Sequence, residues 1–365
     1  MLQHIKAYNY RNLENVDLDL SDSINLLTAP NGFGKTNLIE MIYYSVFRAS
    51  FRPLHSYAEL LGDKDNHLKI ELDWHNSILE TIISNTSKLQ RKTILNGKVG
   101  RKRKILETFG LVLFAPHSVD LVNGEPKIRR DDLDFFIMML EPNYESDLKT
   151  YNSVLKNRNA LLKAMREGLA DSKELKYWTE KLISVGSILE KVRINYIKQI
   201  NDFVPIVSKD LYHDITDLKV EYIPNVEFDS EDEIENALTN KYSENEQKEI
   251  IVGKTLYGPH KDDYYFKFDT SVYKDKNLKF HGSRGQQRIG SFLFKIAQAE
   301  ITREYNSNDV LLLLDDIMSE LDSTHRDNIA EFLINKNYQI IITGADINEI
   351  PSIIKDSANT INPKN

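Results

Sequence analysis

The 365-residue sequence contains no cysteine, which excludes disulfide bonds and thiolate metal sites and fits a reducing cytoplasm, the location we expect. No apolar run approaches the about 20 residues that a membrane-spanning helix needs. The first residues, MLQHIK, also lack the apolar core of a signal peptide. These absences predict a soluble protein without a membrane anchor.

The net charge of −8 does not exclude a nucleic-acid partner, because the basic residues are clustered. The length supports one large or two ordinary domains, and we find no internal repeat or low-complexity tract. Fold class and function therefore have to be inferred from local motifs.

The stretch from Ile24 to Met41 has the layout of a phosphate-binding loop. An apolar strand, INLLT, leads into a glycine-bearing turn, and Lys35 and Thr36 open a helix with apolar residues at helical spacing. The backbone N–H groups of such a loop hold a β-phosphate. We expect Lys35 to reach the β- and γ-phosphate oxygens and the Thr36 hydroxyl to bind Mg²⁺. The residues predicted to contact the nucleotide are Ala29, Pro30, Asn31, Gly32, Phe33, Gly34, Lys35 and Thr36.

Ala29 stands where this loop usually begins with glycine, which is tolerable if the position does not need a positive φ. The alternative, an ordinary strand–turn–helix with a chance GKT, fits the flanking patterns less well. Ahead of the loop, Arg11 and Asn12 lie in a short turn between two predicted strands. They either contact nucleotide phosphates or form a solvated turn.

Basic residues follow a predicted Asn96-Gly97 hairpin turn. Such a run is usually a solvated face, and the alternative is contact with a DNA phosphate backbone. The candidates for that contact are Arg101, Lys102 and Arg103.

The pattern changes after Pro116: from Leu133 to about Lys209 two long amphipathic helical stripes replace the strand signals, and an acidic stretch follows from Asp229 to Gln247. The second stripe is predicted to stop before Pro205. We therefore expect a mostly helical lobe at 116–249, inserted into an ATPase head formed by residues 1–115 and 250–365.

Two further motifs complete an ATPase pattern. Ser283, Gly285 and Gln286 lie in GSRGQQR at the start of a long helix, which predicts a second anion site. The apolar strand 310–314 ends in Asp315 and Asp316. The position of the first carboxylate suits Mg²⁺, and the second is placed to orient or deprotonate the attacking water as the catalytic residue.

This order of motifs resembles the ABC-type ATPase heads of the SMC group and, within it, the RecF family. The resemblance spans the chain through YRNL (10–13), NGFGKTN (31–37), FAP (114–116), GEPKIRR (124–130), RNALL (158–162), GPHKDD (258–263), SRGQQR (283–288) and LLLDDIMSELD (312–322). It implies an α/β fold, an ABC/SMC-type P-loop ATPase head with a mixed sheet and helices, carrying an inserted mostly helical lobe.

The resemblance also implies a function. It predicts ATP and Mg²⁺ as cofactors, with Ser283 facing the ATP of the opposite protomer in an ATP-dependent homodimer. It further predicts binding to gapped or single-strand/duplex junction DNA, cooperation with RecO and RecR in loading RecA, and a role in the SOS response.

Departures from the family pattern bear on hydrolysis. Ala29 replaces a glycine, and Gly344 gives the phosphate-sensing switch position no side chain. We therefore expect slow, DNA-stimulated ATP hydrolysis. Two alternatives remain: an ABC-like NTPase of a defence or toxin system that does not act in gap repair, and a small-molecule kinase whose site is complete in one chain.

Overall fold

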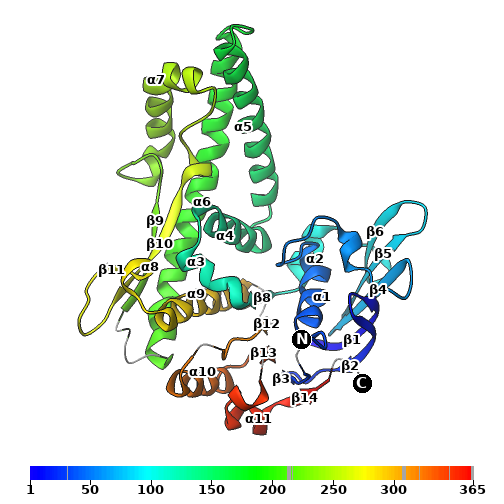
Figure 1. The fold of residues 1–365 in the computed structure, drawn as a ribbon. Helices are drawn as coiled ribbons and strands as arrows, with labels where there is room; N and C mark the ends of the chain where they lie inside the picture. Colours follow the sequence, from blue (N-terminus) through cyan, green and yellow to red (C-terminus); the bar gives the residue numbers. More distant parts are fainter. Residues whose placement is uncertain are drawn as a thin grey trace. The chain divides into compact units, whose positions relative to one another are not determined.

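The computed structural model (Figure 1) describes residues 1–30, 32–211, 215, 217–305, 310–319, 321–344 and 346–362. The chain forms two compact units. Unit 1 comprises Met1–Val119, Ile206–Thr216 and Ser283–Asn365. Unit 2 comprises Asp120–Pro205 and Asp217–Gly282. Unit 2 thus begins close to residue 116 and continues past residue 249, because the strand Asp263–Asp269 pairs with the strand Asp217–Ile223 inside the same unit.

Unit 1 contains an antiparallel sheet in the strand order β2-β1-β4-β5-β6-β7. Its strands are β1 Leu2–Tyr10, β2 Leu13–Asp19, β4 His67–Trp74, β5 Ser77–Asn85, β6 Leu89–Leu95 and β7 Lys98–Val99. Apolar residues alternate along these strands and bury one face. The predicted hairpin turn is confirmed, since Asn96 and Gly97 both have positive φ, 51° and 74°.

A second sheet of unit 1 is parallel, in the order β14-β3-β13-β12-β8. Its strands are β3 Ile24–Leu27, β8 Leu111–Phe114, β12 Leu311–Leu314, β13 Gln339–Thr343 and β14 Asn359–Ile361. Strands β3, β8, β12 and β13 are buried throughout, as the continuous apolar runs predict. Their carboxyl ends lie along one edge, where open α/β sheets bind ligands.

Helices accompany both sheets of unit 1. They are α1 Lys35–Phe47, α2 Lys102–Thr108, α9 Arg284–Tyr305, α10 Ser323–Asn335 and α11 Ser352–Ser357, with short 3₁₀ helices at Tyr57–Leu60, Pro116–Val119 and Ile347–Glu349. Helix α9 is buried from Gln287 to Thr302 and packs on β8 through an edge-to-face pair of Phe292 with Phe114. This packing ties the start of α9 to the parallel sheet.

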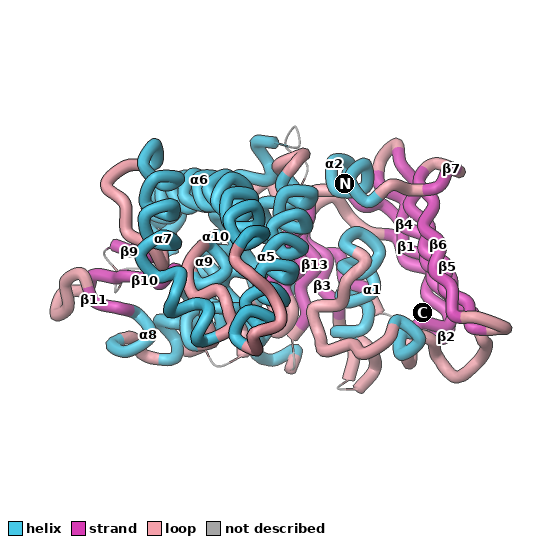
Figure 2. The backbone as a smooth tube through the Cα atoms, turned by 90° about the horizontal axis from the view of Figure 1, so that it is seen from above, coloured by secondary structure: helices cyan, strands magenta, loops and turns pink. Residues whose placement is uncertain are grey.

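Unit 2 is mostly helical, as predicted. Its helices are α3 Asp120–Asn123, α4 Pro126–Leu140, α5 Tyr144–Arg166, α6 Lys173–Leu211, whose last turns belong to unit 1, α7 Ile234–Val252 and α8 Leu278–His281, with 3₁₀ helices at Glu231–Glu233 and Pro259–Lys261. A small antiparallel sheet adds β9 Asp217–Ile223, β10 Asp263–Asp269 and β11 Lys276–Asn277. Figure 2 shows α5, α6 and α7 gathered together.

One detail of α6 corrects the sequence interpretation. The prediction that the second helix stops before Pro205 is wrong, because α6 continues through this proline to Leu211. A proline removes one backbone hydrogen bond of the helix and crowds the preceding turn. Buried packing on both sides of the proline can offset this cost and keep the helix continuous.

Within the described residues, none of the helices has both the length and the apolar character required to cross a membrane.

Candidate functional site

The loop between β3 and α1 turns at two glycines in the left-handed region. Gly32 and Gly34 have φ of 83° and 99°, which other residues rarely adopt. A Cβ on Gly34 would lie 2.6 Å from a methyl carbon of Leu13. Ala29 does not have a positive φ, so its side chain is tolerated there, as expected. Helix α1 begins at Lys35, whose ammonium donates to the Ala29 carbonyl at 2.5 Å. Asn31 lies outside the described residues.

The turn ahead of the loop lies directly against it. The Asn12 amide donates to the Gly32 carbonyl at 2.8 Å and accepts from the Asn37 amide at 2.7 Å. The Arg11 guanidinium donates instead to both carboxylate oxygens of Glu40, at 2.6 and 2.9 Å. Asn12 therefore lies beside the loop, and a phosphate contact by Arg11 stays a prediction.

Glu40 is the buried centre of a charged cluster beneath the loop. Its side chain is fully buried, and it accepts from Arg11, from Arg52 and from the Ser50 hydroxyl. Burial alone would raise its pKa, but hydrogen bonds from Arg11, Arg52 and Ser50 hold the pKa of Glu40 below its ordinary value. Arg52 also donates to Asn37 at 2.6 Å, which directs this second cation to the rim of the loop.

Asp315 lies where β12 ends and is the best-supported metal ligand. Its Oδ1 accepts from the Thr343 hydroxyl at 2.7 Å and from the Thr36 hydroxyl at 3.2 Å. Burial raises the pKa of Asp315, an effect that hydrogen bonds from both threonines oppose. A buried carboxylate beside a threonine hydroxyl suits Mg²⁺, which takes one or two protein oxygens and completes its shell with water and phosphate. The two residues predicted as metal ligands thus lie together.

Asp316, the predicted catalytic residue, follows in an unusual conformation. Its φ is 53°, in the left-handed region, and its N–H donates to the Thr343 hydroxyl at 3.0 Å. Unlike Asp315, it is only half-buried and faces the same pocket as the phosphate loop. That exposure suits a residue that must contact water.

A pocket of about 490 Å³ joins these residues. It is lined by Gly32, Gly34, Lys35, Thr36, Asn37, Arg52, Pro116, Asp315, Asp316 and Thr343. Apart from Arg52, which lies beyond α1, this lining follows the strands β3, β8, β12 and β13, whose carboxyl ends meet at one edge of the parallel sheet. The sequence analysis did not name Asn37, Arg52, Pro116 or Thr343 as site residues, although Asn37 and Pro116 lie in the motifs NGFGKTN and FAP and Thr343 ends an apolar strand.

The second predicted anion site forms a capped helix start. The Gln286 N–H donates to the Ser283 hydroxyl at 3.2 Å, and the Ser283 N–H donates to the Gln286 side-chain oxygen at 2.9 Å. These reciprocal bonds form a capping box. Ser283 is exposed, and an added Cβ on Gly285 would meet only the Ser283 hydroxyl, at 3.9 Å. None of these residues lines the pocket described above, so their contact with a phosphate stays a prediction.

The basic cluster lies at the start of α2. Arg101 is exposed and precedes the helix. Arg103 forms an ion pair with Glu107 at 2.8 Å, one turn later. Exposed pairs of this kind contribute little to stability. A role of Lys102 or its neighbours in DNA binding stays a prediction.

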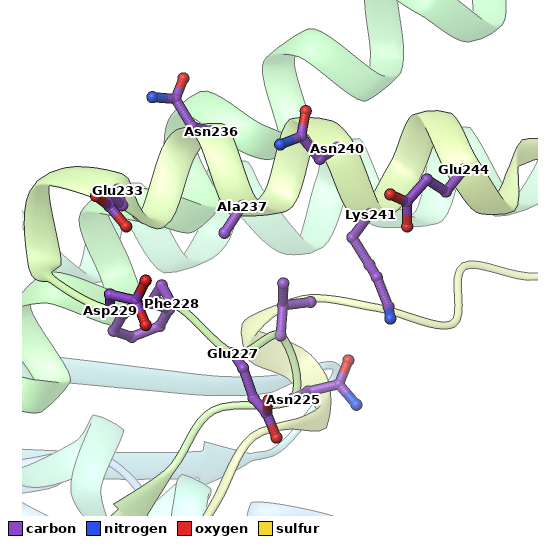
Figure 3. Close-up of a pocket in the computed structure, with 11 residues that line it drawn as sticks. Asn225, Glu227, Phe228, Asp229, Glu233, Asn236, Ala237, Asn240, Lys241 and Glu244 are labelled. Carbon is purple, nitrogen blue, oxygen red and sulfur yellow. The ribbon is translucent and has the colours of Figure 1, made fainter.

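A larger pocket, of about 610 Å³, lies in unit 2 between the segment 225–233 and α7 (Figure 3). Its lining carries Lys241 but also four carboxylates, from Glu227, Asp229, Glu233 and Glu244. A triphosphate would meet repulsion there, whereas the pocket in unit 1 offers Lys35, Arg52 and a helix N-terminus. The charges that line the pocket in unit 1 therefore suit a nucleotide better than those of the pocket in unit 2.

Comparison with known proteins agrees with this geometry. Residues 1–353 match the family described as "RecF/RecN/SMC N terminal domain". The DNA replication and repair protein RecF of Oceanobacillus iheyensis is 31% identical over 348 residues, covering 94% of this chain and 93% of the relative. RecF of Clostridium perfringens is 30% identical over 361 residues, covering 98% of this chain and 96% of the relative.

Solved structures show the same similarity. The recombination mediator protein RecF–ATPrS of the RecFOR pathway superposes with a TM-score of 0.83 at 26% identity, covering 96% of this chain and 94% of that one. An Smc head bound to a domain of ScpA superposes at 0.55 with 12% identity, which concerns the fold alone. The fold is thus confirmed as an α/β, ABC/SMC-type ATPase head, and the chain belongs to the RecF family of DNA replication and repair proteins.

Proposed function

We propose that this chain is an ATP-dependent DNA-binding protein of recombinational repair and replication restart. It dimerises on ATP at gapped or single-strand/duplex junction DNA and, with RecO and RecR, helps to load RecA, which feeds the SOS response. Membership of the RecF family supports the repair role. The relatives named above align over nearly the whole chain, which disfavours a defence NTPase or a small-molecule kinase that shares only the ATP motifs.

The observation that carries the nucleotide part is the convergence on one pocket of Lys35, Thr36 and Asp315. Lys35 and the N-terminal amides of α1 supply positive charge for the β- and γ-phosphates. Thr36 and Asp315 would hold Mg²⁺, which would neutralise charge between the phosphates. Asp316, half-buried in the same pocket, would orient the attacking water, and hydrolysis is slow because Gly344 offers no side chain to sense the γ-phosphate.

The dimer is proposed because the helix start at Ser283 does not line the pocket of its own chain. Ser283 and Gly285 form an exposed, uncrowded helix start in the same unit, yet they do not line the pocket of their own chain. Two chains related by a two-fold axis would bring each helix start onto the γ-phosphate bound by the partner. ATP would then bind the protomers together, and hydrolysis would release them.

Sedimentation with and without ATP and Mg²⁺ tests the dimer. The parent is expected to be monomeric without nucleotide and dimeric with it. Ser283→Arg should retain ATP binding but not dimerise, because its side chain fills the place of the partner's γ-phosphate. Ser87→Arg, an equal change at an exposed residue of the β5–β6 turn, is the control and should dimerise like the parent. Full ATP-driven dimers of Ser283→Arg would contradict the arrangement.

Retention on gapped duplex DNA tests the DNA part. Parent protein with ATP should be retained, and Lys35→Ala, which cannot hold the nucleotide, should be retained no better with ATP than without it. Equal retention of the parent with and without ATP would contradict ATP-dependent DNA binding, while leaving the nucleotide site itself intact.

A further inference from the structure

A carboxyl group without a hydrogen-bond donor among the described residues is buried inside unit 2. Glu190 of α6 is 1% exposed, and neither of its side-chain oxygens accepts a hydrogen bond from the described part of the chain. The group that it faces is a second carboxyl, Asp262 of the GPHKDD motif, which is also 1% exposed. Two neighbouring carboxyl groups in a buried place cannot both stay ionised without a large cost.

The cation that acts on Glu190 is Arg193, one turn further along α6, but its hydrogen bonds go to other acceptors. Its guanidinium donates to both carboxylate oxygens of Asp134, at 2.8 and 2.9 Å, and to the Pro259 carbonyl at 2.7 Å. This charge is thus paired with Asp134, and Glu190 has to be neutralised in another way.

Asp262 is the member of the pair whose surroundings favour the charged form. One of its oxygens accepts from the Tyr222 hydroxyl at 2.5 Å, and the other accepts from the Asn225 N–H at 2.7 Å. Glu190 has no such donors among the described residues, so the proton of the pair belongs on Glu190. Burial and the neighbouring Asp262 charge raise the pKa of Glu190 to about 9.

The other titratable groups around the pair stay neutral between pH 6 and 8. Burial lowers the pKa of His260, whose Nδ1 lies 2.7 Å from the Tyr151 hydroxyl, to about 4. Burial raises the pKa of each neighbouring tyrosine, which are Tyr151 of α5, Tyr222 of β9 and Tyr242 of α7. None of these side chains supplies a charge that would replace the proton on Glu190.

The remaining charged groups near the pair have partners of their own or lie in solvent. Arg130 of α4 donates to the Asp262 carbonyl at 2.6 Å, and Lys261 is exposed. Arg158 of α5 pairs with Glu249 of α7 at 2.6 Å. The pair therefore keeps its own proton.

We propose that Glu190 and Asp262 share one proton, which fastens α6 to the GPHKDD turn and to β9 and makes the stability of unit 2 depend on pH. The Glu190 O–H donates to the Asp262 carboxylate, which Tyr222 of β9 binds as well. Loss of the proton places two like charges in one buried site. The connection involves neither ATP nor DNA.

The sign of the pH dependence follows from the proton. The folded pKa of Glu190, about 9, lies above its unfolded pKa of about 4.3. The stabilisation is therefore complete below about pH 4.3 and is lost progressively as the pH rises toward about 9. Between these limits, folding takes up one proton at this pair, so the connection is firmest in acid.

Urea unfolding at pH 6, 7 and 8 tests the shared proton. In a Trp74→Phe background of the full chain, the fluorescence of Trp178, in α6, reports unit 2. Glu190→Gln keeps the size of the side chain and offers an amide N–H to Asp262 at every pH, but it takes up no proton. The unfolding constant of the parent, divided by that of Glu190→Gln, should therefore rise about tenfold per pH unit, or about 100-fold from pH 6 to 8.

Glu180→Gln is the matched control. It makes the same change on the same helix at an exposed residue, and its unfolding constant should follow the pH dependence of the parent. A ratio of parent to Glu190→Gln that stays constant from pH 6 to 8 would overturn the shared proton.

Infrared spectroscopy decides the question where Glu190→Gln does not fold. The spectrum is recorded at pH 7 on Asp315→Asn, which removes the buried carboxyl of unit 1 whose pKa is also raised. The C=O stretch of a protonated carboxyl group should persist in this folded protein, because Glu190 holds its proton at pH 7. A spectrum that contains ionised carboxylates alone overturns the proposal.

Discussion

Replacing Glu40 by glutamine should destabilise unit 1 more than any change to a surface ion pair. The carboxylate is fully buried and pairs with Arg11 and Arg52, whose side chains are 23% and 33% exposed. Glu40→Gln leaves two guanidinium groups facing a neutral amide that is itself a donor. Removing one partner of a buried charge cluster costs about 3–5 kcal/mol. Because both arginines keep some contact with water, we expect the lower end, about 3 kcal/mol.

Thermal unfolding measures this cost. For a unit of this size, about 1 kcal/mol shifts the midpoint by roughly 2–4 °C, so Glu40→Gln should lower it by roughly 6–12 °C. The protein has two tryptophans, one in each unit. In a Trp178→Phe background, the fluorescence of Trp74, which is 4% exposed in β4, reports unit 1 alone.

Glu107→Gln is the control, since it breaks the more exposed pair with Arg103. Such a pair contributes about 0.3–0.5 kcal/mol, so its midpoint should move by no more than about 2 °C. Equal shifts in the two variants would refute the argument that burial makes the Glu40 cluster important.

The pH dependence has a definite sign. The folded pKa of Glu40 lies below its ordinary value, so the stabilisation is complete above the unfolded pKa of about 4.3 and is lost as the pH falls through the lowered pKa. The difference in midpoint between the parent and Glu40→Gln should stay constant from pH 8 to about 5 and narrow below about 4. A difference that widens in acid would contradict this assignment.

Three other predictions concern nucleotide and DNA. Lys35→Ala should weaken ATP binding by roughly 10- to 100-fold in calorimetry, because one charge-assisted contact contributes about 1.5–3 kcal/mol; unchanged affinity would remove Lys35 from the site. Asp315→Asn should weaken Mg²⁺-dependent ATP binding, whereas Asp316→Asn should bind nearly normally but hydrolyse more slowly in single-turnover assays; equal losses of affinity would contradict this division. If Arg101, Lys102 and Arg103 bind DNA, replacing all three should make the log–log salt dependence of binding shallower, by about 0.9 for each DNA phosphate that the variant no longer neutralises.

The elements that the sequence predicted are those whose signals are local. The phosphate loop could be predicted because strand, glycines and helix start lie within one continuous stretch, and Gly32 and Gly34 are needed by their own backbone conformation. The buried strand before Asp315 could be predicted because a parallel strand covered on both faces is apolar throughout.

The pocket residues that the sequence analysis did not name are placed by tertiary contacts, which a local pattern does not encode. Arg52 follows α1 in an irregular segment, and its contacts with Glu40 and Asn37 direct it to the pocket. One signal was present: Glu40 lies among the apolar residues of α1, where a charged side chain has to be buried with partners. The sequence did not show which residues these partners are, because Arg11 precedes α1 in the sequence and Arg52 follows it.

Binding and hydrolysis therefore draw on different amounts of the structure. The predicted phosphate contacts within one chain come from one continuous segment, the loop and the first turn of α1. The position of Asp316 depends on three segments, since its carbonyl is held by Arg288 of α9, its N–H by Thr343 of β13, and its strand by the hydrogen bond of Asp315 to β8. A substitution at any of these supports redirects the carboxylate while the loop still holds the nucleotide. Hydrolysis should consequently be lost before nucleotide binding as such a sequence diverges.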